Sequence, residues 1–142
     1  MKLDIKPLAF AISVLPSQIT FATDLTVEVV GLKNDQGNIH VALFNTKKDF
    51  PYQKAIFLEK EVTINNNYSF CIFTNLKPGA YAIAAYHDEN NNNEFDQNFL
   101  GFPLESFGFS NQAKVFLGPP SFDDAKFFIL DKNITVKIDF DY

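Results

Sequence analysis

The chain has 142 residues, of which 46% are hydrophobic and 20% charged, a composition typical of one globular domain rather than a disordered or membrane-embedded chain. Its formal net charge is −5, and its 12 basic residues are all lysines scattered along the sequence. Because phosphate binding depends on clustered Lys and Arg, we expect no nucleic-acid partner.

The first 22 residues have the layout of a secretory signal peptide. Lys2 and Lys6 precede an apolar run over residues 8–15, and a short polar segment ends at Ala22. The run suits the apolar region of a signal peptide and is too short to span a bilayer. We expect cleavage after Ala22, which leaves a periplasmic or secreted domain over residues 23–142 with no transmembrane segment.

The rest of the chain contains seven stretches in which apolar and polar residues alternate, as they do in half-buried β-strands. The last stretch is the clearest, because Val136, Ile138 and Phe140 alternate with Lys137 and Asp139. The seven predicted strands cover residues 25–32, 39–45, 56–64, 68–73, 80–86, 125–130 and 134–142. The single cysteine, Cys71, lies within one of them and is expected to be a buried apolar side chain.

Short connectors rich in Asn and Asp separate several of these strands. Those at residues 34–38, 65–67 and 131–133 are typical of tight turns and predict hairpins between the strands that they join. No helical periodicity of useful length is present, which disfavours an α/β enzyme fold. We therefore predict an all-β domain, a single antiparallel β-sandwich of seven to eight strands.

Residues 87–123 lack a strand pattern and are rich in phenylalanine. We expect the rings either to close one end of the sandwich as a second core or to line a partly exposed ligand-binding surface. Ser121 and Asp124 have the spacing of a capping box, which predicts one helical turn after Ser121. The rings in question are Phe95, Phe99, Phe102, Phe107, Phe109, Phe116 and Phe122.

A set of motifs spans this region: Gly79-Ala80-Tyr81-Ala82-Ile83, His87-Asp88-Glu89-Asn90, Leu100-Gly101, Pro103, Glu105, Gly108-Phe109-Ser110-Asn111 and Gly118-Pro119-Pro120-Ser121-Phe122. Together they resemble domain-of-unknown-function family 2141, small exported bacterial proteins, from about Leu25 onward. The resemblance implies an export signal and a sandwich similar to transthyretin-like or carboxypeptidase-regulatory-like domains, and it implies no reaction. The family pattern resembles Asp-x-Asn-x-Asn-Gly, but Asn93 stands where glycine is usual. Asparagine tolerates the left-handed conformation, so we expect the turn to be kept.

Side-chain oxygens recur at every second residue from Asp88, at Asp88, Asn90, Asn92, Glu94 and Asp96. Calcium loops place side-chain ligands at relative positions 1, 3, 5 and 9, because this hard cation takes six to eight oxygens. Asp88, Asn90, Asn92 and Asp96 occupy those four positions. The sequence therefore predicts a calcium-binding loop, and the alternative is an Asn-rich polar connection.

The loop is not a complete EF-hand. The twelfth position, where an EF-hand has a bidentate glutamate, is Phe99, and no helices are predicted on either side. A backbone carbonyl, a water molecule or Glu105 folding back would have to complete the coordination.

The function expected from these observations is a non-enzymatic binding or structural domain of the bacterial cell envelope, monomeric or weakly self-associating. Its partner would be an envelope protein or a small molecule, with His87, Glu105, Phe107 and Phe109 as candidate ligand-binding residues. The alternative is a small secreted hydrolase-like enzyme that uses His87 and nearby carboxylates. The sequence has no nucleophile elbow, oxyanion-hole glycine pair or zinc-ligand spacing to support this alternative.

Overall fold

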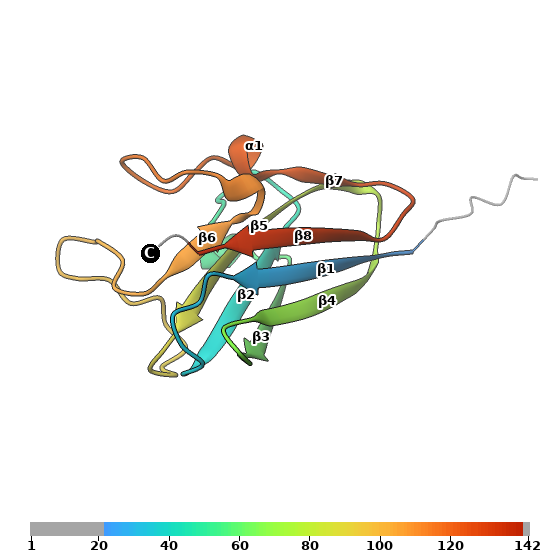
Figure 1. Cartoon of the computed structure of the whole chain (residues 1–142). Helices are drawn as coiled ribbons and strands as arrows, with labels where there is room; N and C mark the ends of the chain where they lie inside the picture. The colour runs from blue at the N-terminus through green and yellow to red at the C-terminus, as the bar shows by residue number, and fades with distance from the viewer. Residues whose placement is uncertain (1–21, 141–142) are drawn as a thin grey trace, which may run out of the picture.

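The computed structural model describes residues 22–140, which form eight strands in two sheets (Figure 1). The smaller sheet has the order β4-β1-β8, with β1 (Thr23–Val30), β4 (Ser69–Leu76) and β8 (Ile134–Asp139). The larger has the order β3-β2-β5-β6, with β2 (Asn38–Phe44), β3 (Leu58–Thr63), β5 (Gly79–Asp88) and β6 (Phe107–Phe109), while β7 (Phe127–Ile129) also pairs with β5. The predicted all-β sandwich is confirmed. Except for Ala22, the predicted signal peptide lies outside the described residues.

One strand pair differs from the predicted antiparallel arrangement. β1 and β8 run parallel, with Leu25 opposite Ile134 and Val29 opposite Ile138, whereas every other pair among the described strands is antiparallel. Alternation of apolar and polar residues fixes which side of a strand is buried, but it is the same in either direction of pairing. The first and last strands of the domain consequently lie side by side, as Figure 1 shows.

The three predicted hairpins are wrong. The connectors at residues 34–38, 65–67 and 131–133 each join strands that belong to different sheets, namely β1 to β2, β3 to β4, and β7 to β8. Gly37, Asn66 and Asn67 do have positive φ angles, so the chain reverses there as expected. A single antiparallel bridge joins Asn65 and Tyr68 across the second connector, but the strand after each reversal packs across the sandwich and does not form a ladder with its predecessor.

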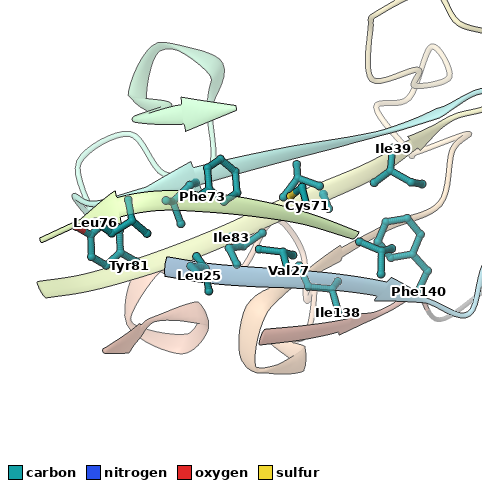
Figure 2. Close-up of a cluster of buried hydrophobic side chains, with 14 of the residues drawn as sticks. Leu25, Val27, Ile39, Cys71, Phe73, Leu76, Tyr81, Ile83, Ile138 and Phe140 are labelled. Atoms are coloured by element: carbon teal, nitrogen blue, oxygen red, sulfur yellow. The ribbon is translucent and has the colours of Figure 1, made fainter. Parts of the chain in front are cut away.

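The main core fills the space between the two sheets (Figure 2). β1 alternates between buried and half-buried residues along its whole length, and β5 contributes Tyr81, Ile83 and Ala85 from the other sheet. Cys71 is buried as predicted, and burial raises the pKa of its thiol to about 11. Figure 2 shows Leu25, Val27, Phe73 and Ile138 converging on this space.

A second core covers the outer face of the larger sheet. Alanines at positions 80, 82 and 84 of β5 face this side and leave room for larger side chains from outside the sheet. The buried members of this core are Phe44, Phe50, Ala82, Phe109, Phe122 and Ala125. Phe44 and Ala82 belong to β2 and β5 of the sheet itself, and the others come from the segment before the 3-10 helix η1 (Gln53–Ala55), from β6, and from the helix α1 (Phe122–Ala125). Ser121 and Asp124 form the predicted capping box at the start of α1.

The seven phenylalanines of the irregular region therefore have different environments. Phe109 and Phe122 are buried in the second core and Phe107 is half-buried, so these rings do build a second core, but it covers a face of the larger sheet and not one end of the sandwich. Phe95, Phe99, Phe102 and Phe116 are exposed. No helix between residues 22 and 140 has both the length and the apolar composition that a membrane span needs.

Substitutions in β8 test the predicted faces of the last strand. Ile138 is fully buried and Phe140 almost so, Val136 is half-buried, and Lys137 and Asp139 are exposed. We expect Ile138→Ala to lower the free energy of unfolding by roughly 2–5 kcal/mol, because it opens a cavity in the core. Lys137→Ala should cost under about 0.5 kcal/mol. Urea denaturation measures both, and equal losses would show that the faces are assigned wrongly.

Candidate functional site

The candidate calcium loop begins at the end of β5, where Asp88 is almost fully buried. Its carboxylate oxygens accept the backbone N–H groups of Asn92 and Asn93, at 3.1 and 2.8 Å. Asn91 and Asn93 have positive φ angles of 56° and 61°, a conformation that asparagine adopts more readily than most residues. The turn is therefore formed with Asn93 in the position usual for glycine.

The asparagine side chains that follow Asp88 contact Asp96. Nδ2 of Asn90 donates to Oδ2 of Asp96 at 2.7 Å, and Nδ2 of Asn92 donates to Oδ1 at 3.0 Å. The amide oxygens of Asn90 and Asn92 accept the backbone N–H groups of Asn92 and Glu94 at 3.0 and 2.9 Å. The loop thus brings Asp88, Asn90, Asn92 and Asp96 together through hydrogen bonds, whereas the side chain of Glu94 is exposed.

Glu105 folds back onto this loop after the intervening residues 97–104. Its Oε2 accepts the backbone N–H of Asp96 at 3.1 Å, and its Oε1 is buried. Burial raises the pKa of Glu105 above its ordinary value. The backbone N–H groups of Asp96 and Glu89 oppose this shift, and the negative charges of Asp96 and Asp88 add to it. A third carboxylate therefore lies against the loop.

The donor atoms in this loop are of mixed type. Within residues 22–140, no cluster of three or more His, Cys, Asp or Glu side chains is arranged so that it could hold a metal ion. A cation here would need amide or backbone oxygens beside the carboxylates, a mixture of hard oxygen ligands that calcium accepts. The amide groups of Asn90 and Asn92 direct their N–H bonds at Asp96, so partial positive charge already stands beside this carboxylate.

His40 and Tyr86 adjoin the loop on the outer face of the larger sheet, where β2 and β5 place them opposite each other. Their rings are stacked with centroids 4.8 Å apart, and Nε2 of His40 lies 3.4 Å from Oδ2 of Asp88. Burial raises the pKa of Tyr86 to about 12, and four carboxylates add to the shift, namely Asp88, Glu105, Glu59 and Glu61. The electrostatic potential around the loop is therefore negative.

His87 points to the other side of β5, into the sandwich, and is fully buried. Because a carbonyl oxygen can only accept, Nε2 of His87 donates to the carbonyl of Gln36, at 2.5 Å. Nδ1 lies 3.9 Å from Oε1 of Glu89. Gly37 permits this close packing, since a Cβ there would lie 1.9 Å from the backbone oxygen of Asp88. The hydrogen bond between His87 and Gln36 thus links the β1–β2 connection to the end of β5.

Phe107 and Phe109 belong to a row of aromatic rings on the outer side of β5. The ring centroids are 5.4 Å apart for Tyr86 and Phe95, 5.7 Å for Phe95 and Phe107, and 5.9 Å for Phe107 and Phe109. The row connects the loop to the second core, in which Phe109 is buried. The predicted ligand-binding residues are therefore divided, because His87 lies inside the sandwich and does not share a surface with Phe107 and Phe109.

The family model described as an uncharacterized protein conserved in bacteria, domain-of-unknown-function family 2141, matches residues 27–137. The chain belongs to this family. The match spans β1 to β8 and includes the candidate loop together with Glu105. No curated protein and no solved structure matches this member of family 2141.

In this family 2141 chain, sequence reasoning missed His40 and Tyr86 as parts of the site. Alternation puts His40 on the same side of its strand as Ala42, and Tyr86 on the same side as Ala84, but only the register between β2 and β5 makes His40 and Tyr86 neighbours. The paired residues are 46 positions apart in sequence (86 minus 40), and no local signal specifies such a register. The contact of Glu105 with the loop, by contrast, was among the options that the sequence suggested.

The pKa of Glu105 gives a test of this geometry. The folded chain binds the Glu105 proton more tightly than the unfolded chain does. Protonated Glu105 therefore contributes to the free energy of unfolding below the pKa of the unfolded chain. This contribution is lost as pH rises through the pKa of the folded chain. Glu105→Gln keeps an oxygen acceptor for the Asp96 N–H and removes the charge. In chelator, we expect the variant to gain stability relative to the unmodified protein as pH is raised from about 4, the ordinary glutamate range, to neutral.

Urea denaturation across this pH range provides the measurement. Glu94→Gln is the matched control, because it removes the same charge from an exposed side chain of the same loop. Stability curves for Glu105→Gln and the unmodified protein that stay parallel with pH would contradict the assigned environment of Glu105.

Proposed function

We propose that this member of family 2141 is an exported, non-enzymatic binding or structural domain of the bacterial cell envelope, stabilised by calcium held in the loop from Asp88 to Asp96. The observation that carries the proposal is the convergence of Asp88, Asn90, Asn92 and Asp96 in one loop, with Glu105 folded back onto Asp96. Glu105 replaces the missing twelfth ligand of the EF-hand pattern as a source of carboxylate oxygen.

The charges around the loop support a cation as the ligand. Asp88, Asp96 and Glu105 lie close enough for the charges of the first two to raise the pKa of the third. The mutual repulsion of these carboxylates opposes folding at neutral pH, and a divalent cation among them would convert it into attraction. Burial of the Glu105 carboxylate, which raises its pKa, adds a second cost that a bound cation would offset.

The hydrolase alternative finds no support in this geometry. A general base must come within hydrogen-bond reach of a substrate proton, but the His87 ring is fully buried and its Nε2 is bonded to the carbonyl of Gln36. Ser110 is also fully buried, and its hydroxyl is bonded to the backbone of β5 and of α1. We therefore do not propose a reaction for this domain.

Calcium binding predicts a gain in stability. Sites of this kind in extracellular modules have dissociation constants of about 10⁻⁴–10⁻³ M. Calcium at about ten times the dissociation constant should raise the free energy of unfolding by roughly 1.4 kcal/mol, because it binds the folded state only. Magnesium should give less, since it demands a compact octahedral site and retains its waters. Thermal melts in chelator, calcium and magnesium measure these effects.

Two charge-neutralising variants separate specific binding from general screening. Asp96→Asn removes a proposed ligand and should abolish the calcium gain, whereas Glu89→Gln removes the same charge from a side chain directed toward His87 and should keep it. The calcium-binding part of the proposal fails if the unmodified protein melts identically in calcium and in chelator, or if both variants lose the gain equally.

Export is tested on the protein from its native host. The motive is the basic start, the apolar run over residues 8–15 and the small residue Ala22. We expect the mature N-terminus at Thr23, the first residue of β1, so cleavage would leave the whole sandwich intact. Mass spectrometry of the fractionated host determines the terminus, and recovery of the chain in the cytoplasm with Met1 retained would refute export.

A further inference from the structure

Two loops of the domain present large apolar side chains to solvent. The first loop, residues 97–104, carries Phe99 at 95% exposure, and the second, residues 113–120, carries Leu117 at 96%. The other exposed apolar residues of the two loops are Leu100, Phe102, Leu104, Val115 and Phe116. Figure 1 shows both loops projecting from the side of the sandwich at which β8 ends, away from the start of β1.

The first loop satisfies much of its own backbone. The N–H groups of Leu100 and Phe102 donate to Oδ1 of Asn98, at 2.9 and 3.0 Å. The N–H of Asn98 donates to the carbonyl of Phe102, and that of Gly101 to the carbonyl of Asn98, both at 2.9 Å. Leu104 completes the set by donating to the carbonyl of Asp96 at 2.9 Å. The loop is thus a closed turn whose exposed rings are not needed to hold its shape.

The second loop is also a tight turn. Leu117 has a positive φ of 55° and Gly118 one of 151°, and the N–H of Phe116 donates to the carbonyl of Gly118 at 3.2 Å. This conformation directs Phe116 and Leu117 outward, with exposures of 84% and 96%. Such exposure of adjacent large apolar residues at a turn costs solvation free energy that packing onto the domain would avoid.

The charge of the two loops differs from that of the rest of the protein. The chain contains 17 acidic residues, but residues 97–104 and 113–120 contain none, and their single charged residue is Lys114. The domain as a whole is acidic, but these two loops carry no negative charge. The phosphate groups of a lipid surface would therefore not repel them. This charge distribution complements a phospholipid headgroup layer, and one lysine adds a weak attraction.

We propose that these two loops insert their apolar side chains into the interface of a phospholipid membrane. Separate, convex turns enter a fluid interface without a matching surface, whereas a protein partner would need a pocket for each of them. Internal hydrogen bonding of the first loop also meets a requirement of the interface, where unpaired backbone groups are costly. The proposal gives the proposed envelope domain a lipid partner, and it does not depend on calcium or on the loop from Asp88 to Asp96.

The test uses the absence of tryptophan from the chain. Phe99→Trp and Phe116→Trp each place a single tryptophan in one loop, and Phe128→Trp places the control at a residue of β7 that is 61% exposed. Phe128 pairs with Ala80 at the start of β5, whereas the first loop follows the end of that strand. Each variant is expressed from the full sequence, purified in the form that a bacterial host exports, and mixed in chelator with phosphatidylethanolamine–phosphatidylcholine vesicles.

We expect a blue shift of tryptophan emission, and quenching by phospholipid brominated in the acyl chain, for the variants at positions 99 and 116 and not for the control at 128. Phe99→Ser should weaken vesicle partitioning by roughly tenfold or more, since it removes the most exposed apolar side chain of the first loop. Phe128→Ser should leave partitioning unchanged. Weak dependence on salt is expected, because insertion is mainly apolar.

Three results would overturn the proposal. The first is unchanged emission of both loop variants on addition of vesicles, and the second is an equal response of all three tryptophans. A blue shift that grows with protein concentration without vesicles would assign the loops to contact between copies of the chain. All measurements are made in chelator, so their outcome does not depend on calcium binding. Each tryptophan reports on its own loop, so the outcome does not depend on residues 1–21 either.

Discussion

The packing of the domain depends on β5, which must bury both faces and satisfy its backbone where its pairing partners change. β7 pairs with residues 79–81 and β6 with residues 84–86, so the N–H of Ile83 lies between the two pairings. The hydroxyl of Ser110 accepts this N–H at 2.8 Å and donates to the carbonyl of Ala125 at 2.6 Å. Ser110 is fully buried, and an unpaired N–H at this position would cost about 1–3 kcal/mol. One side chain thus joins β5, the 3-10 helix η2 (Ser110–Gln112) and α1, and it holds the second core against the alanines of β5.

The buried faces of the strands were predictable because they depend on local alternation, and their pairing was not. Ile138 and Cys71 are buried where the period-2 pattern placed them. The connectors at residues 34–38 and 65–67 look like hairpin turns, since their composition reports only that the chain reverses. Whether the next strand pairs beside its predecessor or packs across the core depends on nonlocal contacts, as does the parallel pairing of β1 and β8. The three-residue β6 was missed because Phe107-Gly108-Phe109 is too short to show a period.

The same distinction applies to the candidate site. The hydrogen bonds within the loop join residues of one nine-residue segment, 88–96, so they could be anticipated from the sequence. The tolerance of asparagine at position 93 for the left-handed conformation is likewise a local property. His87 was misplaced as a companion of Phe107 and Phe109, because alternation along β5 sends it to the inner face, opposite to Tyr86. The stacking of His40 on Tyr86 required the register of two strands, which a single sequence does not supply.

The fold also determines how rigidly the loop is held. At one end, Asp88 is buried where the β1–β2 connection packs on β5, and the absence of a side chain at Gly37 allows that contact. At the other end, Phe95 packs on Tyr86 and Phe107, which links the loop to the second core through Phe109. A loop fixed at both ends loses little conformational entropy when it binds a ligand. The repulsion between Asp88, Asp96 and Glu105 is therefore imposed by packing at both ends of the loop, and its relief by the proposed cation would contribute to affinity with little reorganisation.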